Sequence, residues 1–184
     1  AGGVICETER LIFREWRESD LELFARMWQD VKVMEFFPNL LTHAESAVLI
    51  ERIQAKFSQE GFCFFAVELK FTAEFIGFIG LSIPSFQAHF TPCVEIGWRL
   101  AAKYWGYGYA SEGAQKCLEI GFKQFKLREI VSFAVKDNLN SIKVMQKIGM
   151  QQDLNGSFMH PSLAEDSPLA EPVLYRIQAP QEQC

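Results

Sequence analysis

The sequence predicts an α/β fold, and two observations support this prediction. Three runs with the composition and alternation of β-strands, at 62–69, 75–81 and 94–100, follow two stretches in which apolar residues recur at helical spacing. The chain then continues with a glycine-rich loop, a helix, a strand and a further helix. This order of elements is typical of α/β proteins.

One strand and two helices are expected before these runs. Residues 9–16 alternate loosely and predict a first strand. Ser19 and Glu22 have the spacing of a capping box, in which a hydroxyl and a carboxylate bind the free N–H groups of a helix start. Thr42 and Glu45 repeat this spacing, and the following helical pattern stops near Gly61. We therefore expect helices from these two starts, the first ending at about residue 30.

The middle of the chain predicts a hairpin and a third long strand. The runs at 62–69 and 75–81 are joined by a short segment that suits a hairpin, and residues 84–92 form a loop. In the run at 94–100 the apolar side chains share one face, so the other face carries Glu95, Gly97 and Arg99.

The last third of the chain predicts two helices and two strands. Helices are expected at 109–124 and 139–147, the second closed by Gly149 in the C′ position. Strands are expected at 129–135 and 173–177. The segment at 151–172 is largely polar and contains proline.

Composition limits the class of protein. With 184 residues, 49% of them hydrophobic, the chain predicts a single domain over 1–184. The net charge is −5 and Lys and Arg are scattered, which argues against a nucleic-acid partner. The five cysteines are widely spaced without a C-x-x-C pair, and the three histidines lie in unrelated contexts, so we expect no disulfide framework and no metal site. No apolar stretch approaches the length of a membrane span and no leader pattern is present, so we expect a cytoplasmic protein without a membrane partner.

The most informative segment is the glycine loop that follows the third strand. Gly106 and Gly108 let the backbone approach a ligand, and the helix that begins directly after them offers free N–H groups and a positive dipole end. Such a turn can bind phosphate, although a turn needed only for packing has the same glycines. No Gly-Lys-Ser/Thr follows, and Ser111 stands where a dinucleotide-binding loop has its third glycine. Nucleotide hydrolysis and hydride transfer therefore lack their usual motifs.

Three segments in order resemble motifs of the GNAT superfamily of acetyltransferases. Lys103-Tyr104-Trp105-Gly106-Tyr107-Gly108 resembles its acetyl-CoA pyrophosphate loop, Gln/Arg-x-x-Gly-x-Gly/Ala, with Lys103 departing from the first position. Asn138-Leu139-Asn140-Ser141, followed by Lys147 and Gly149, resembles its Asn-x-x-Ser helix that ends in Lys-x-Gly. Thr8-Glu9-Arg10-Leu11, through Arg14 and Trp16, resembles the first strand of the ribosomal-protein N-terminal acetyltransferase branch.

The resemblance implies a mixed, mostly antiparallel sheet flanked by helices. Acetyl-CoA, as co-substrate, is expected where the third long strand and its following strand diverge. The residues that the resemblance and the loop assign to cofactor binding are Trp98, Arg99, Leu100, Lys103, Trp105, Gly106, Tyr107, Gly108, Tyr109, Ala110, Asn138, Ser141 and Lys147.

Acetyl transfer to an amine needs a base, an acid and a donor to the carbonyl oxygen. Glu95 is the candidate base, although a strand-edge carboxylate in a salt bridge has the same pattern. The tyrosine that many GNAT proteins place seven residues beyond the asparagine is Met145 here, so Ser141 is the candidate acid, with a helix cap as its alternative role. A backbone N–H near Trp98 to Leu100 is the candidate oxyanion donor if this strand carries a bulge.

The predicted function is transfer of an acetyl group from acetyl-CoA to a primary amine of a protein N-terminus or a small molecule. Two alternatives remain: an N-acetyltransferase specific for an amino acid, polyamine or antibiotic, and a non-catalytic module that binds acyl-CoA. The resemblance implies that the first two helices and the loop at 84–92 determine which acceptor binds. We expect a monomer or homodimer.

Overall fold

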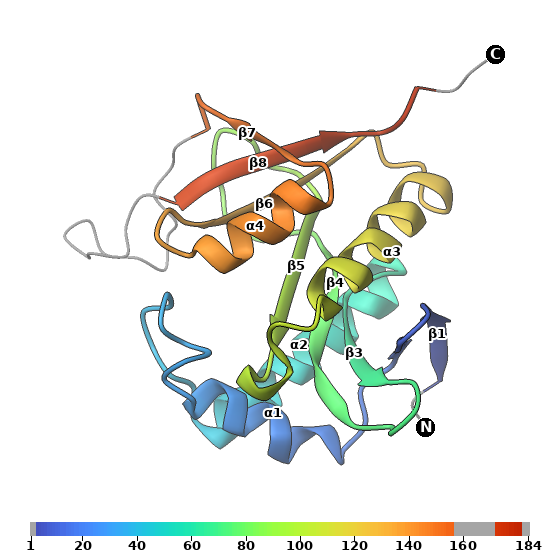
Figure 1. Ribbon diagram of the computed structural model, residues 1–184, viewed down its shortest axis with the longest axis vertical. Helices are drawn as coiled ribbons and strands as arrows, with labels where there is room; N and C mark the ends of the chain where they lie inside the picture. Colours follow the sequence, from blue (N-terminus) through green and yellow to red (C-terminus); the bar gives the residue numbers. More distant parts are fainter. Residues whose placement is uncertain (1–2, 157–171, 182–184) are drawn as a thin grey trace.

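The structure, a computed structural model, describes residues 3–156 and 172–181. These residues form one eight-stranded sheet in the order β1-β2-β3-β4-β5-β6-β8-β7, with helices on both faces (Figure 1). The strands are β1 (Val4–Glu7), β2 (Leu11–Arg14), β3 (Phe64–Leu69), β4 (Phe75–Ser82), β5 (Glu95–Leu100), β6 (Glu129–Val135), β7 (Gln151–Asp153) and β8 (Pro172–Gln178). The helices are α1 (Asp20–Gln29), α2 (His43–Glu60), α3 (Tyr109–Lys123) and α4 (Leu139–Lys147), with a short 3-10 helix, η1 (Ala102–Tyr104).

The predicted fold class, a mixed and mostly antiparallel sheet flanked by helices, is confirmed. Every neighbouring pair of strands is antiparallel except β5 and β6, which are parallel. The pairing of β4 with β5 is continuous from Gly77–Leu100 to Ser82–Glu95. In contrast, β5 and β6 share one registered pair, Glu95 with Val131, and then diverge. Figure 1 shows β6 and β8 turned away from the direction of β5.

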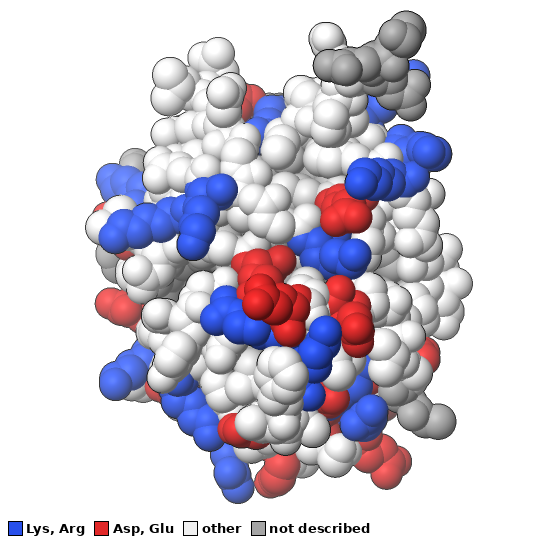
Figure 2. All heavy atoms as spheres, turned by 45° about the vertical axis from the view of Figure 1, so that its right-hand side comes forward, with Lys and Arg blue, Asp and Glu red and all other residues white. Residues whose placement is uncertain are grey.

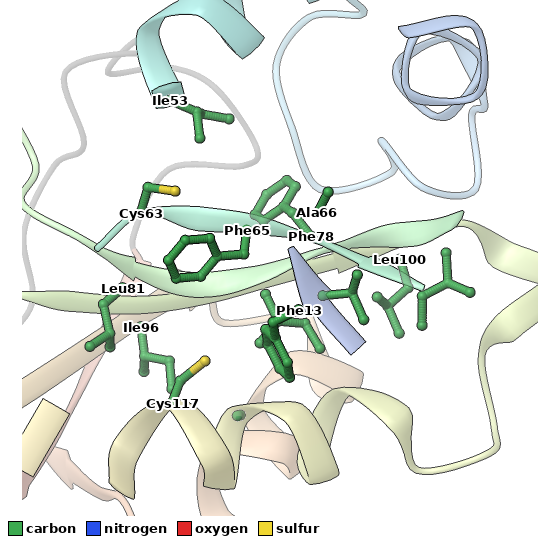
Figure 3. Close-up of a cluster of buried hydrophobic side chains, with 14 of the residues drawn as sticks. Phe13, Ile53, Cys63, Phe65, Ala66, Phe78, Leu81, Ile96, Leu100 and Cys117 are labelled. Carbon is green, nitrogen blue, oxygen red and sulfur yellow. The ribbon is translucent and has the colours of Figure 1, made fainter. Parts of the chain in front are cut away.

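The two faces of the sheet are covered by different helices. Figure 3 shows Ile53 of α2 on the side of the strands that also carries Cys63, Ala66 and Phe78, while Cys117 of α3 lies on the other side, with Ile96 and Phe13. Small residues let α3 approach closely: a Cβ at Gly113 would lie 2.4 Å from the Ile79 Cδ1, and Ala114 is fully buried. Because close packing of this kind leaves little freedom to shift, the start of α3 is fixed relative to the end of β5.

Most of the expected element boundaries agree with the structure. The capping box at the start of α2 is confirmed, since the Glu45 N–H donates to the Thr42 hydroxyl at 3.1 Å and the Thr42 N–H donates to the Glu45 carboxylate at 3.0 Å. Gly61 ends this helix with φ of 84°, a conformation that favours glycine. The strands at 129–135 and 173–177 and the helix at 139–147 are confirmed as β6, β8 and α4.

The capping box expected at Ser19 is wrong. Ser19 precedes α1 without a side-chain hydrogen bond. Asp20 is instead buried and receives two hydrogen bonds of 2.8 Å from the Arg14 guanidinium, whose Nε donates to Glu68 at 2.7 Å. The start of α1 is therefore fixed by an ion cluster with β2 and β3, a long-range contact that local spacing does not reveal.

Three further differences concern strands. The first expected strand, at 9–16, is shorter and pairs with β1, which was not predicted; β7 was also missed. The candidate oxyanion donor depended on whether the third long strand carries a bulge, and the pairing of β5 with β4 shows none. Part of the polar segment at 151–172 lies outside the described residues.

The surface carries intermixed charges on the side that holds α3. Figure 2 shows acidic and basic side chains interspersed over this side. On α3, Lys116 and Lys123 lie 4.0 and 3.7 Å from Glu119. Opposite charges one helical turn apart stabilise the exposed face of a helix only slightly. Within the part of the chain that the structure describes, no helix is long and apolar enough to span a membrane.

The ion cluster around Arg14 leads to a stability prediction. Asp20→Asn leaves the buried Arg14 guanidinium with one carboxylate, and we expect it to lower the free energy of unfolding by about 3 kcal/mol, because an incompletely paired buried charge is costly. Urea unfolding measures this change. Glu18→Gln, at an exposed position in the same segment, is the control, with an expected change within about 0.5 kcal/mol. Equal stability of the two variants would show that the cluster does not hold α1.

Candidate active site

Two adjoining cavities open where β5 and β6 diverge. The smaller cavity measures about 260 Å³ and the larger about 520 Å³. Both are lined by the end of β5, the start of α4 and the segment between α1 and α2, through the shared residues Phe36, Phe37, Trp98, Arg99, Asn138 and Ser141. The divergence of two strands thus produces one continuous site with two compartments.

The larger cavity ends at the glycine loop and the first turn of α3. Gly106 and Gly108 have φ of 86° and 80°, values that favour glycine, and the site of a Cβ on Gly106 is open space. The first backbone hydrogen bond of α3 runs from the Glu112 N–H to the Gly108 carbonyl, so the N–H groups of residues 109–111 have no partner within the helix. This arrangement can bind an anionic group such as a pyrophosphate.

Arg10 fixes the conformation of the glycine loop. Its guanidinium donates to the Tyr107 carbonyl at 2.9 Å and to the Glu112 carboxylate at 2.6 Å, and it lies 4.5 Å from the centre of the Tyr109 ring. The β1–β2 turn is therefore attached to both the loop and the first turn of α3. Arg10 also adds a positive charge beside this anion site.

The edge of β5 that faces the opening has unpaired backbone groups. The Val94 carbonyl accepts from the Val131 N–H at 2.9 Å, and the Ile96 carbonyl accepts from the Ser132 hydroxyl at 3.0 Å. Backbone groups alternate between the two edges of a strand, so the N–H and C=O of Trp98 point to this same edge. Since β6 has moved away at that level, the Trp98 N–H faces the opening without a strand partner.

Glu95 and Arg99 line the smaller cavity from the same face of β5, as the alternation predicts. The other side chains around them are largely aromatic: Phe36, Phe37, Phe64, Phe78 and Phe133. Burial raises the pKa of the Glu95 carboxyl to about 7, with the positive charges of Lys56 and Arg99 opposing the rise. Glu95 forms no salt bridge within 4.0 Å among the described residues. It is therefore not the salt-bridged strand-edge carboxylate that the sequence left open as its alternative role.

The start of α4 brings Asn138 and Ser141 to both cavities. Asn138 is the N-cap, and its side-chain oxygen accepts from the Ser141 N–H at 3.3 Å. The cap of this helix is therefore Asn138 and not Ser141. Met145 is buried beside the smaller cavity, at the position where the resemblance implies a tyrosine in many GNAT proteins.

The structure brings together most of the residues predicted to bind the cofactor. Ten of them line the larger cavity: Trp98, Arg99, Leu100, Trp105, Gly106, Gly108, Tyr109, Ala110, Asn138 and Ser141. Three do not line either cavity. Lys103 lies 3.7 Å from Glu74, Tyr107 stacks on Tyr109 at 5.5 Å, and Lys147 is exposed on α4. Roles in binding remain predictions for all thirteen.

Sequence reasoning missed the segment between α1 and α2. Phe36 and Phe37 line both cavities, yet they lie in a stretch without helical or strand periodicity. Lys143, on α4, lines the larger cavity and carried no motif. Conversely, the loop at 84–92 lines neither cavity and instead packs Phe86 and Phe90 against Phe133.

Comparison with known proteins agrees with this geometry. A family model described as an acetyltransferase (GNAT) domain matches residues 10–151. The uncharacterized protein YkkB of Bacillus subtilis is 31% identical over 144 residues, which are 78% of this chain and 83% of that protein. The uncharacterized N-acetyltransferase YnaD of the same species is 31% identical over 147 residues, covering 79% and 82%. The chain therefore belongs to the GNAT acetyltransferase family and is an acetyl-CoA-dependent N-acetyltransferase.

Solved structures share the fold over almost the whole chain. A GNAT-family acetyltransferase from Bacillus anthracis has a TM-score of 0.76 at 28% identity, covering 96% of this chain and 99% of that chain. RimL, a ribosomal L7/L12 alpha-N-protein acetyltransferase solved with coenzyme A, has a TM-score of 0.74 at 15% identity, covering 96% and 98%. The second likeness concerns the fold alone, and the resemblance to the ribosomal-protein branch stays a prediction.

The conformation of the glycine loop leads to a binding prediction. Gly108→Ala places a side chain at φ of 80°, which costs about 1–2 kcal/mol and displaces the free N–H groups in the first turn of α3. We expect the Kd for CoA, measured by calorimetry, to rise about tenfold. Gly61→Ala is the matched control, because its φ of 84° carries the same strain far from the loop. Gly61→Ala is expected to lower stability and to leave the Kd for CoA unchanged. An unchanged Kd in both variants would show that the glycine loop does not bind CoA.

Proposed function

We propose that the enzyme transfers the acetyl group directly from acetyl-CoA to a primary amine, of a protein N-terminus or a small molecule, in a ternary complex. The observation that carries this proposal is the position of Glu95. Its carboxylate lies in the smaller cavity, which is continuous with the larger one, and its raised pKa suits a group that accepts a proton near neutral pH. The amine would enter the smaller cavity and the acetyl donor the larger one.

In this proposal the backbone holds the acetyl donor. The N–H groups of residues 109–111 and the glycine loop bind the pyrophosphate, while the free edge of β5 lies along the pantetheine arm. The Trp98 N–H faces the opening and donates to the thioester carbonyl as negative charge develops on its oxygen. No bulge is needed for this role, because the divergence of β6 already frees the N–H group.

Glu95 acts as the base and Ser141 as the acid. Glu95 removes a proton from the ammonium form of the acceptor, directly or through a water molecule, so that the amine can attack the carbonyl carbon. The C–S bond then breaks, the nitrogen that has attacked loses its remaining extra proton, and the Ser141 hydroxyl relays this proton to the leaving thiolate. Ser141 suits this role because it lines both cavities and because Asn138 performs the capping function.

The pKa of Glu95 leads to a prediction on pH. Because the carboxyl must be deprotonated to act, kcat/KM should rise with pH and level off above about 7, falling roughly tenfold per pH unit below it. Glu95→Gln should abolish this fall of kcat/KM below about pH 7, and it should lower kcat/KM itself about 10²- to 10⁴-fold. The increase with pH that remains comes from the amine itself, which titrates near ~8 for an α-amino group and ~10.4 for lysine.

Lys56 provides a second variant for the same measurement. The positive charge of Lys56 lowers the pKa of Glu95. Lys56→Gln should therefore shift the rise of kcat/KM to higher pH without abolishing it. Steady-state release of free thiol, measured with N-terminal peptides, lysine peptides and small amines, follows all variants and also identifies the acceptor class. Wild-type turnover in both Glu95→Gln and Ser141→Ala would contradict the assigned roles.

A further inference from the structure

Arg99 lies at the junction of the two cavities in an unusual environment. It occupies the second half of β5, and its guanidinium carbon lies 3.5 Å from the centre of the Phe37 ring and 4.5 Å from that of Trp28. The residue lines both cavities, so the stacked guanidinium borders the space available to ligands. Stacking between aromatic rings satisfies the flat faces of the guanidinium and leaves its N–H edge for hydrogen bonding.

No anionic partner accompanies this cation. Among the residues 3–156 and 172–181, no carboxylate lies within 4.0 Å of Arg99, and the one polar contact of its N–H groups is with the Met34 sulfur at 4.0 Å. Arg14, by comparison, is a buried arginine that forms ion pairs with two carboxylates, at 2.7 and 2.8 Å. The difference indicates that the partner of Arg99 comes from a ligand.

Two physical observations agree with a missing partner. Burial lowers the pKa of Arg99 to about 9, opposed only by the charge of Glu95, so binding an anion here would relieve a desolvated charge. The Trp28 indole N–H, in the ring that stacks on Arg99, is buried and has no hydrogen-bond partner among the described residues. Buried donors are normally satisfied, and this one lies in the ring that packs against the guanidinium without a carboxylate partner.

The face of the sheet shows which ligand completes this site. Arg99 is the cross-strand neighbour of Phe78 on β4, and it lies on the face of the sheet that α1 and α2 cover. The glycine loop leads into α3, which covers the opposite face (Figure 3). Glu95 lies on the same face as Arg99, four residues earlier on β5, with Gly97 between them. Arg99 lines both compartments, but its position on the face of Glu95, opposite to α3, directs it away from the glycine loop and toward the compartment of the acceptor.

We propose that the acceptor is a small amine that carries a carboxylate, and that Arg99 binds this carboxylate while Glu95 faces the amine. The proposal rests on the proposed function and specifies its substrate class. A cavity of about 260 Å³, at the small end of ligand sites, suits a molecule of amino-acid size. The aromatic walls would contact its apolar part, and the guanidinium would bind both carboxylate oxygens in the bidentate geometry that arginine favours.

The test compares acceptors that differ only in the carboxylate. Pairs such as phenylalanine with phenethylamine and leucine with 3-methylbutylamine are assayed for acetyl transfer by the wild-type enzyme, Arg99→Gln and Arg99→Lys. We expect the wild type to prefer the carboxylated member about 10- to 100-fold in kcat/KM, mainly through KM. Arg99→Gln should abolish this preference without weakening CoA binding, and Arg99→Lys should retain part of it. Arg26→Gln, at an exposed position on α1, is the control with unchanged kinetics.

An equilibrium measurement separates this proposal from the proposed function. N-acetylated amino acids and the matching N-acetylated amines are titrated by calorimetry into the enzyme–CoA complex, which needs no turnover. Binding of the carboxylated ligand that depends on Arg99 supports the anion site even if no amine in the panel is acetylated, a result that would count against the proposed function. Equal use of both members of each pair, or an Arg99→Gln variant that loses CoA affinity instead, overturns the proposal.

Discussion

The active site depends on the single point at which β5 and β6 pair. Glu95 and Val131 hold the two parallel strands together, and beyond this pair the strands separate. The Ser132 hydroxyl still reaches the Ile96 carbonyl, but at Trp98 the backbone of β5 has no neighbour on this edge. A sheet normally satisfies such groups within the protein, so leaving them free in a cavity is costly unless a ligand binds them. The divergence thus creates the cavities and supplies donors to their ligand.

The surrounding fold fixes the parts that meet at this point. Gly113 brings α3 close to β4, and Arg10 attaches the glycine loop to the β1–β2 turn. On the other face the Arg14 cluster positions the start of α1, which carries Trp28 beneath Arg99. The donor compartment and the acceptor compartment are therefore supported by different faces of one sheet, and β5 contributes to both.

The sequence predicted the parts of the site that depend on local pattern. The alternation in β5 placed Glu95 and Arg99 on one face, and the glycines before α3 predicted the loop, because periodicity and backbone freedom are local properties. Phe36 and Phe37 could not be found in this way, since only the tertiary fold brings an irregular segment over the cavity. The capping box at Ser19 was wrongly predicted for the same reason. Its pattern is local, while the start of α1 is held by the contact of Asp20 with Arg14, on β2. The missing carboxylate beside Arg99 is also a property of three-dimensional surroundings alone.

The exchange of backbone amide protons at β5, followed by NMR, tests the central claim most directly. The Trp98 amide should exchange rapidly in the free enzyme and slow markedly with saturating acetyl-CoA, because the ligand then supplies the partner that β6 does not. The amides of Gly97 and Arg99, directed toward β4, should be protected in both states and serve as internal controls. Slowed exchange in the glycine loop with no change at Trp98 would contradict the account, because it would mean that the free edge of β5 does not bind the acetyl donor.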